Sequence, residues 1–161
     1  MSIPQRYIPK VLSNEDRNIQ KKNIIKSRKM YQNGKYSKRP KVKTFRSKMS
    51  KHLMNVKEIY NIDQLKVNDA LVKKTKCSQK GLRKIINKGM GAYYSSGSRP
   101  NQTAESWGVA RLGSAITGGP AGMVDYHILE KECKNDSLAL KLAKKTCRKA
   151  NRCNLNKTKK K

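Results

Sequence analysis

The chain has 161 residues, and 39 Lys and Arg against 10 Asp and Glu give it a formal net charge of +29. Leu, Ile, Val and Phe make up only about 19% of the residues, so some parts are expected to order only against a partner. No run approaches the roughly 18 apolar residues of a membrane span, and the first residues lack a signal-peptide pattern. The totals argue against a transmembrane or secreted protein and favour one that binds a polyanion or an acidic surface.

Charge divides the chain into three segments, which we take as its expected domains. Residues 1–57 carry a net charge of +15, residues 58–137 of +4, and residues 138–161 of +10, while nine of the ten glycines lie in the middle segment. We therefore expect a basic N-terminal arm with one or two helices, a compact helical centre with a Gly/Ser loop, and a basic C-terminal helix and tail.

In chain order, residues 7–10 (Tyr-Ile-Pro-Lys) are expected to form an extended anchor. Ser13 then resembles an N-cap, with acids in the following turn, and predicts a helix to about Tyr31, before Asn33-Gly34. Residues 35–48 are expected to be extended, because Pro40 breaks a helix.

Further helices are predicted near residues 50–60, over 68–76, and after Ser78. The first would present Leu53, Val56 and Tyr60 on one face, and the third would present Leu82, Ile85 and Ile86. Residues 89–102 follow as a loop rich in glycine and serine that carries paired tyrosines.

The last third of the chain predicts three more helices. Thr103 would cap one that runs to about Thr117, and Pro120 would begin one in which His127 is packed between apolar neighbours. Asp136 would cap the last, through about Ala150, with Leu138, Leu142 and Ala143 turned inward. Strand signals are weak, so we expect an all-α fold of five to seven helices.

The four cysteines are Cys77, Cys133, Cys147 and Cys153. Their spacing and the distant histidines, His52 and His127, offer no metal pattern. Free thiols are the default expectation, with a disulfide that uses Cys133, Cys147 or Cys153 as the alternative. No paired-carboxylate or nucleophile–base spacing is present, so we expect no enzyme, no cofactor and no small-molecule substrate.

The loop segment 93–107 has two interpretations. Its tyrosines would stack on bases or on a partner while Arg99 contacts phosphate or carboxylate, or the loop would hold its own fold, with Trp107 in a small core. The residues assigned to structure are Gly97, Ser98, Arg99, Pro100, Asn101, Gln102, Thr103 and Trp107. Those assigned to partner binding are Tyr7, Lys21, Lys22, Arg28, Lys29, Tyr36, Arg39, Phe45, Arg46, Tyr93, Tyr94, Arg99, Lys144, Lys145 and Arg148.

Residues 93–112, which include Gly97-Ser98-Arg99-Pro100-Asn101-Gln102-Thr103, resemble small basic proteins of nucleocytoplasmic large DNA viruses, including the chlorella viruses. Residues 7–13, 117–119 and 124–129 fit the same pattern, so the resemblance covers about residues 7–145. It implies a virion component made in the host cytoplasm, a minor capsid protein on the inner side of the capsid. It implies no reaction and no catalytic residues.

Three hypotheses follow from the charge and the resemblance. The first is a minor capsid protein that cements major and minor capsid proteins, or bridges the shell to the anionic face of an internal membrane or to genomic DNA. The second is a packaged protein that condenses DNA without reading its sequence. The third is an accessory subunit of an enzyme.

Overall fold

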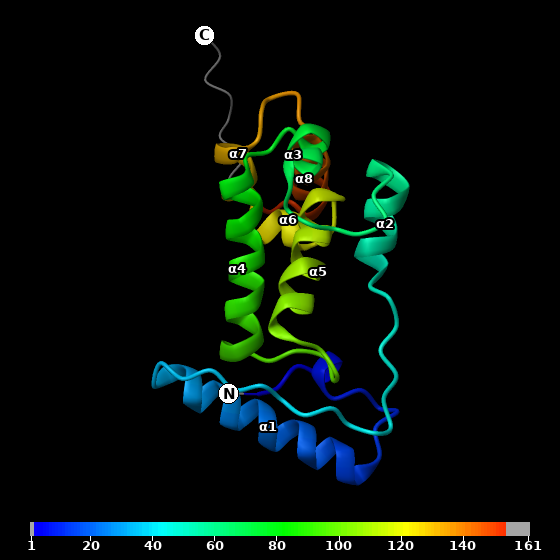
Figure 1. Cartoon of the computed structure of the whole chain (residues 1–161), viewed down its shortest axis with the longest axis vertical. Helices are drawn as coiled ribbons and strands as arrows, with labels where there is room; N and C mark the ends of the chain where they lie inside the picture. Colours follow the sequence, from blue (N-terminus) through cyan, green and yellow to red (C-terminus); the bar gives the residue numbers. More distant parts are fainter. Residues whose placement is uncertain (1, 154–161) are drawn as a thin grey trace. The chain divides into compact units, whose positions relative to one another are not determined.

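A computed structural model of the protein describes residues 2–153 (Figure 1). This part contains eight α-helices, one 3-10 turn and no strand, which confirms the all-α prediction but gives one helix more than the expected five to seven. No helix in it is long and apolar enough to cross a membrane. The elements are η1 (Gln5–Tyr7), α1 (Asn14–Gln32), α2 (Lys51–Tyr60), α3 (Asp69–Thr75), α4 (Gln79–Ser95), α5 (Ala104–Ile116), α6 (Ala121–Val124), α7 (Tyr126–Glu132) and α8 (Leu138–Ala150).

The chain forms two compact units. Within the described residues, unit 1 comprises residues 2–49 and 87–108, and unit 2 comprises residues 50–86 and 109–153. The boundary falls inside α4 and α5, so each of these helices contributes residues to both units. The units therefore do not follow the three charge segments, because residues 87–108 pack with the basic N-terminal part.

Unit 1 has a small core built from segments far apart in the sequence. Its buried side chains are Tyr7, Ile8, Leu12, Ile24 and Val42, against which Ile3, Ile19, Phe45 and Trp107 pack. The expected N-terminal anchor is therefore buried at Tyr7 and Ile8, but it is not fully extended, because Tyr7 lies in the 3-10 turn η1. The ring of Trp107 meets Tyr7 edge-on, with centroids 5.9 Å apart, which places Trp107 in this core as expected.

Unit 2 has the larger core, which draws on α2 to α8. Its fully buried side chains include Leu71, Leu82, Ile85, Leu112 and Leu129. The buried Asp125 accepts two hydrogen bonds from the Arg111 guanidinium, at 2.7 and 2.9 Å. This bond to Asp125, more than any other effect, raises the pKa of Arg111.

The structure corrects the predicted loop over 89–102, because α4 continues through Ser95 and the loop begins only at Ser96. Gly89 and Gly91 lower helix propensity by about 1 kcal/mol each, but tertiary packing overrides them. A Cβ at Gly91 would lie 3.7 Å from the Tyr31 hydroxyl, which is an ordinary van der Waals contact, so packing does not require glycine at this position.

Three further predictions in the last third are wrong in detail. The single helix expected after Pro120 is divided at Asp125 into α6 and α7, and His127 is exposed, not packed. Ser137, not Asp136, caps α8, since its hydroxyl accepts from the backbone N–H of Leu140 at 3.3 Å. Leu138 is 42% exposed and does not turn inward.

The expectation of free thiols is also wrong. Cys77 is bonded to Cys133, and Cys147 to Cys153. The second pair forms because α8 ends at Ala150 and Asn151 adopts a left-handed backbone conformation, which turns the chain back on the helix. The alternative prediction, a disulfide, named Cys133, Cys147 and Cys153 as its possible members but not Cys77.

Candidate binding site

The loop from Ser96 to Thr103 is the centre of unit 1. Gly97 has a φ of +127°, and a Cβ at this position would lie 3.2 Å from atoms of Ile24 and Tyr7. Asn101, also at positive φ, accepts a hydrogen bond from the backbone N–H of Val42 at 2.8 Å and donates to the carbonyl of Phe45 at 2.8 Å. The loop therefore fixes both the start of the chain and the extended segment 35–49.

Two side chains of α1 bind carbonyl oxygens of this loop. The Gln20 amide donates to the carbonyls of Tyr7 and Ser98, both at 3.2 Å, and is itself buried. The Arg28 guanidinium donates to the carbonyl of Ser96 at 2.8 Å. Arg28 was assigned to partner binding, but in this structure it connects α1 to the loop.

Arg39 connects the extended segment to α1 and the loop. Its guanidinium donates to the Ser27 hydroxyl at 3.0 Å, to the Tyr93 carbonyl at 2.6 Å and to the Ser98 hydroxyl at 2.8 Å. It also lies 3.7 Å from the centroid of the Tyr93 ring, a cation–π geometry. Burial lowers the pKa of Arg39, an effect that the neighbouring tyrosines oppose. Arg39 is thus committed to the fold of unit 1.

A buried carboxylate holds the N-terminus of α1 to the extended segment. Asp16 accepts from the backbone N–H of Thr44 at 2.7 Å and from its hydroxyl at 2.5 Å. Both bonds lower the pKa of Asp16, and the bond from the Thr44 hydroxyl has the larger effect. The Thr44 hydroxyl in turn accepts from the backbone N–H of Ser13, the N-cap residue, at 3.0 Å.

Three tyrosines form an aromatic cluster at the surface of unit 1: Tyr31, Tyr36 and Tyr94, called here the tyrosine cluster. The ring centroids of Tyr36 and Tyr94 are 4.9 Å apart, and those of Tyr31 and Tyr94 are 6.3 Å apart with nearly parallel planes. Tyr36 is 68% exposed and Tyr31 37%. Tyr94 also meets the buried Tyr93 edge-on at 5.1 Å, so the cluster rests on the core.

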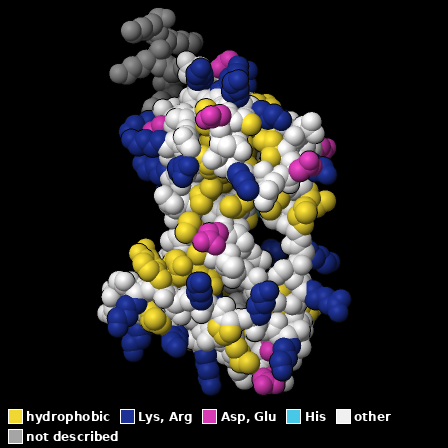
Figure 2. Space-filling model, in the orientation of Figure 1, with side chains coloured by type: hydrophobic (Ala, Val, Ile, Leu, Met, Phe, Trp, Pro, Cys, Tyr) yellow, Lys and Arg dark blue, Asp and Glu magenta, His cyan; other side chains and the backbone are white. Residues whose placement is uncertain are grey.

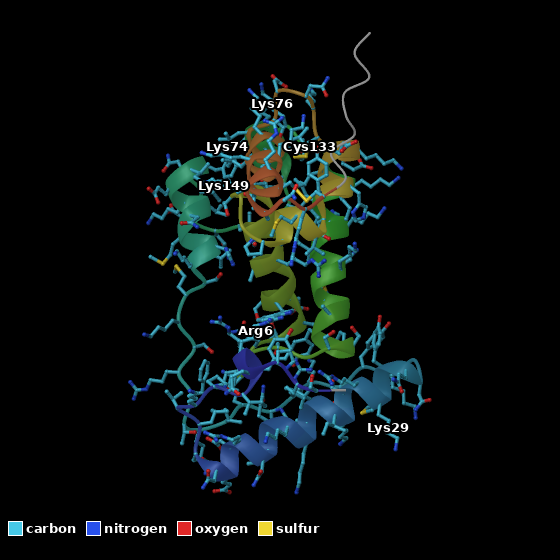
Figure 3. All side chains as sticks on the ribbon, turned by 180° about the vertical axis from the view of Figure 1, so that it is seen from behind. Arg6, Lys29, Lys74, Lys76, Cys133 and Lys149 are labelled. Carbon is cyan, nitrogen blue, oxygen red and sulfur yellow. A yellow bond between two sulfur atoms is a disulfide. The ribbon has the colours of Figure 1, made fainter. Side chains whose placement is uncertain are left out.

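The cations of unit 1 fall into two groups. Of its 17 Lys and Arg residues, only Arg17, Arg28 and Arg39 are half-buried, and all three donate to carbonyl oxygens of the unit. The other 14 are exposed, including all 11 lysines, against two exposed carboxylates, Glu15 and Glu105. Figure 2 shows Lys and Arg side chains scattered over the visible face, among hydrophobic side chains and fewer Asp and Glu, and Figure 3 labels Lys29 on α1.

The remaining residues assigned to partner binding differ in exposure. Tyr7 and Tyr93 are buried, so their rings offer no face to a partner, and Phe45 is half-buried in the core of unit 1. Lys144 is half-buried. The exposed ones are Lys21, Lys22, Lys29, Tyr36, Arg46, Arg99, Lys145 and Arg148.

Of the loop residues assigned to structure, Gly97, Ser98 and Pro100 are buried and Thr103 accepts from the backbone N–H of Ser106 at 3.0 Å. The Gln102 amide oxygen accepts from the Ser106 hydroxyl at 2.8 Å. Arg99 is exposed, so its side chain faces solvent and not the loop carbonyls.

The sequence interpretation missed Gln20 and Ser27, because nothing in a basic helix marks which polar side chains face inward.

Unit 2 offers a weaker candidate beside its first disulfide. A hollow next to Cys77 is lined by lysines together with Glu132 and Asp136, and Lys76 pairs with Asp136. The hollow therefore carries charges of both signs, three lysines and two carboxylates. Among residues 2–153, no three His, Cys, Asp and Glu side chains are grouped so that they would hold a metal ion.

Comparison with known proteins gives one match. A family of unknown function, DUF5824, matches residues 4–127, which include all of unit 1 after residue 3 and much of unit 2. No curated protein and no solved structure matches the chain.

Proposed function

The chain belongs to the DUF5824 family, and we propose that it is a structural, non-enzymatic protein of a virus particle. In this proposal it is a minor capsid protein that fastens capsid subunits to one another and to the acidic material inside the shell. The resemblance of residues 7–145 to small basic proteins of large DNA viruses supports the location. The surface of unit 1 supports the mode of action.

The observation that carries the proposal is the separation of charge within unit 1. Several of its inward-facing polar side chains bond to groups of the unit itself, such as Gln20 to the loop carbonyl of Ser98 and Arg39 to the carbonyl of Tyr93 in α4. Fourteen exposed cations then face solvent with only Glu15 and Glu105 exposed beside them. A surface of this kind repels itself and is stabilised by an acidic macromolecule.

Cross-linking and mass spectrometry of purified particles, together with a particle map, test this proposal. We expect lysine cross-links from the exposed face of α1, at Lys21, Lys22 and Lys29, to capsid subunits. Particles that carry the Lys21→Glu and Lys22→Glu substitutions should lose the protein, whereas the matched pair Lys73→Glu and Lys84→Glu in unit 2 should retain it. Absence of the protein from particles, or density confined to the genome, would refute the proposal.

A second candidate is a DNA-condensing protein, favoured by the fact that all 11 lysines of unit 1 are exposed. Lysine is a strongly hydrated point charge that neutralises phosphate without reading a base. The affinity for duplex DNA should then fall with salt, with a log–log slope of about −0.9 for each phosphate neutralised. A flat salt dependence, or no binding near physiological salt, would reject this candidate.

A further inference from the structure

We infer that the tyrosine cluster is a stacking site for unpaired bases, so that unit 1 binds single-stranded nucleic acid. This goes beyond the proposed function, because neither cementing subunits nor neutralising a duplex requires an exposed aromatic surface. The three rings lie within one unit and within 6.3 Å of one another.

The fold of unit 1 does not require Tyr36. With 68% of its surface exposed, Tyr36 contributes little burial to the core. Gly34, at a φ of +72°, turns the chain after α1, and this turn brings Tyr36 back to within 6.1 Å of Tyr31. The chain thus assembles two exposed rings on Tyr94.

The central ring of the cluster, Tyr94, is supported from beneath. The Tyr94 carbonyl accepts a hydrogen bond from the Ser27 hydroxyl at 3.2 Å, and the Tyr94 ring rests edge-on against Tyr93. Tyr93 is in turn fixed by the Arg39 guanidinium over its ring. A preformed aromatic surface loses little conformational freedom when a base stacks on it.

The charges around the cluster suit a polyanion. Lys29, Lys35 and Lys38 are exposed and neighbour Tyr31 and Tyr36 in the chain, and residues 17–57 contain no Asp or Glu. Burial raises the pKa of Tyr94 most, followed by the neighbouring Tyr93 and the carboxylate of Glu105. One carboxylate is outweighed by the surrounding lysines.

Single-stranded nucleic acid fits these features better than the alternatives. The bases of a duplex are stacked on one another and present no free face, whereas unpaired bases stack on tyrosine regardless of sequence. The centres of protein–protein interfaces are depleted in lysine, whereas exposed lysines lie on both sides of Tyr36 in the chain.

The test uses the full chain and fluorescence anisotropy with a labelled oligothymidylate and an abasic strand with the same number of phosphates. The wild type should bind the oligothymidylate more tightly than the abasic strand. Tyr36→Ala should weaken oligothymidylate binding about tenfold, the lower part of the range for loss of one stacked base. Tyr36→Phe should retain binding, as should Met54→Ala, which removes an exposed apolar side chain of unit 2 (57% exposed).

Circular dichroism and Trp107 fluorescence confirm that each variant is folded. Equal affinity for the two strands, or an equal loss on both from Tyr36→Ala, would overturn the inference, because binding would then depend on phosphate alone. A Tyr36→Ala variant that loses capsid cross-links but keeps its oligothymidylate affinity would also overturn it and would assign the cluster to a protein partner. The binding assay does not depend on where the protein lies in a particle, so its failure would not count against the proposed function.

Discussion

Replacing Arg39 should destabilise unit 1 by a predictable amount. Its guanidinium makes three hydrogen bonds, to Ser27, Tyr93 and Ser98, and one cation–π contact. Each hydrogen bond contributes about 1 kcal/mol net, and the cation–π contact contributes about 1 kcal/mol. Removing the guanidinium also removes the cost of half-burying its charge, about 1 kcal/mol. Arg39→Ala should therefore lower the free energy of unfolding by about 3 kcal/mol. Arg39→Lys keeps the charge but not the planar set of donors, so its cost should be about 2 kcal/mol.

Urea unfolding followed by the fluorescence of Trp107 measures this effect, because Trp107 is the only tryptophan and packs in the core of unit 1. Lys38→Ala is the matched control: this neighbouring cation is exposed, and its loss should change stability by less than about 0.5 kcal/mol. An Arg39→Ala variant as stable as Lys38→Ala, or an Arg39→Lys variant with full stability, would show that the guanidinium does not hold the segment in place.

Three other substitutions test separate parts of the structure. Gly97→Ala should lower the free energy of unfolding in urea by about 1–3 kcal/mol, because φ is +127° and Ile24 lies 3.2 Å from the new Cβ. Gly34→Ala is the control: its φ is also positive, but nothing lies near its Cβ, so its loss of stability should be smaller. Equal losses in the two variants would contradict the packing argument. The lowered pKa of Asp16 means that its carboxylate stabilises the folded state above the ordinary value of about 3.9, and this contribution is lost as pH falls through the lower folded pKa. Asp16→Asn should thus be less stable than the wild type at pH 7 and equal to it at low pH, and a difference independent of pH would exclude this role. The disulfide between Cys77 and Cys133 links positions 56 apart, so the double variant Cys77→Ser, Cys133→Ser should lose about 4 kcal/mol of unfolding free energy. Thermal melts followed by circular dichroism measure this loss. An unchanged melting temperature would show that the disulfide does not stabilise the protein by restricting the unfolded chain.

Local signals in the sequence predicted the starts of most helices, although Ser137 and not the expected Asp136 caps α8. Ser13 accepts from the backbone N–H of Asp16 at 3.1 Å, and Asn68 from that of Leu71 at 2.9 Å, as N-caps do. A cap acts within one turn, so its residue type and position locate the start of a helix to within a residue or two. The extended segment 35–48 was likewise predicted from Pro40 and contains no helix.

Long-range pairing left no such signal. Cys77 and Cys133 meet because the backbone N–H of Ser78 donates to the carbonyl of Glu132, and that of Lys134 to the carbonyl of Lys76, each at 2.8 Å. Nothing near either cysteine announces a partner more than fifty residues away. The same holds for Gln20, whose bond to the loop carbonyl of Ser98 spans 78 positions.

The net charge of +29 likewise combines two populations that the sequence does not separate. In unit 1 the half-buried cations are all arginines, whose planar guanidinium serves several acceptors at once and is less costly to desolvate than an ammonium. The lysines all stay in water, at the ends of flexible chains that lose entropy if they are fixed. Because the arginines bind carbonyl and hydroxyl oxygens of the unit itself, as Arg28 and Arg39 do, these internal bonds do not use a partner's anions. The charge offered to a partner is therefore mainly that of the lysines.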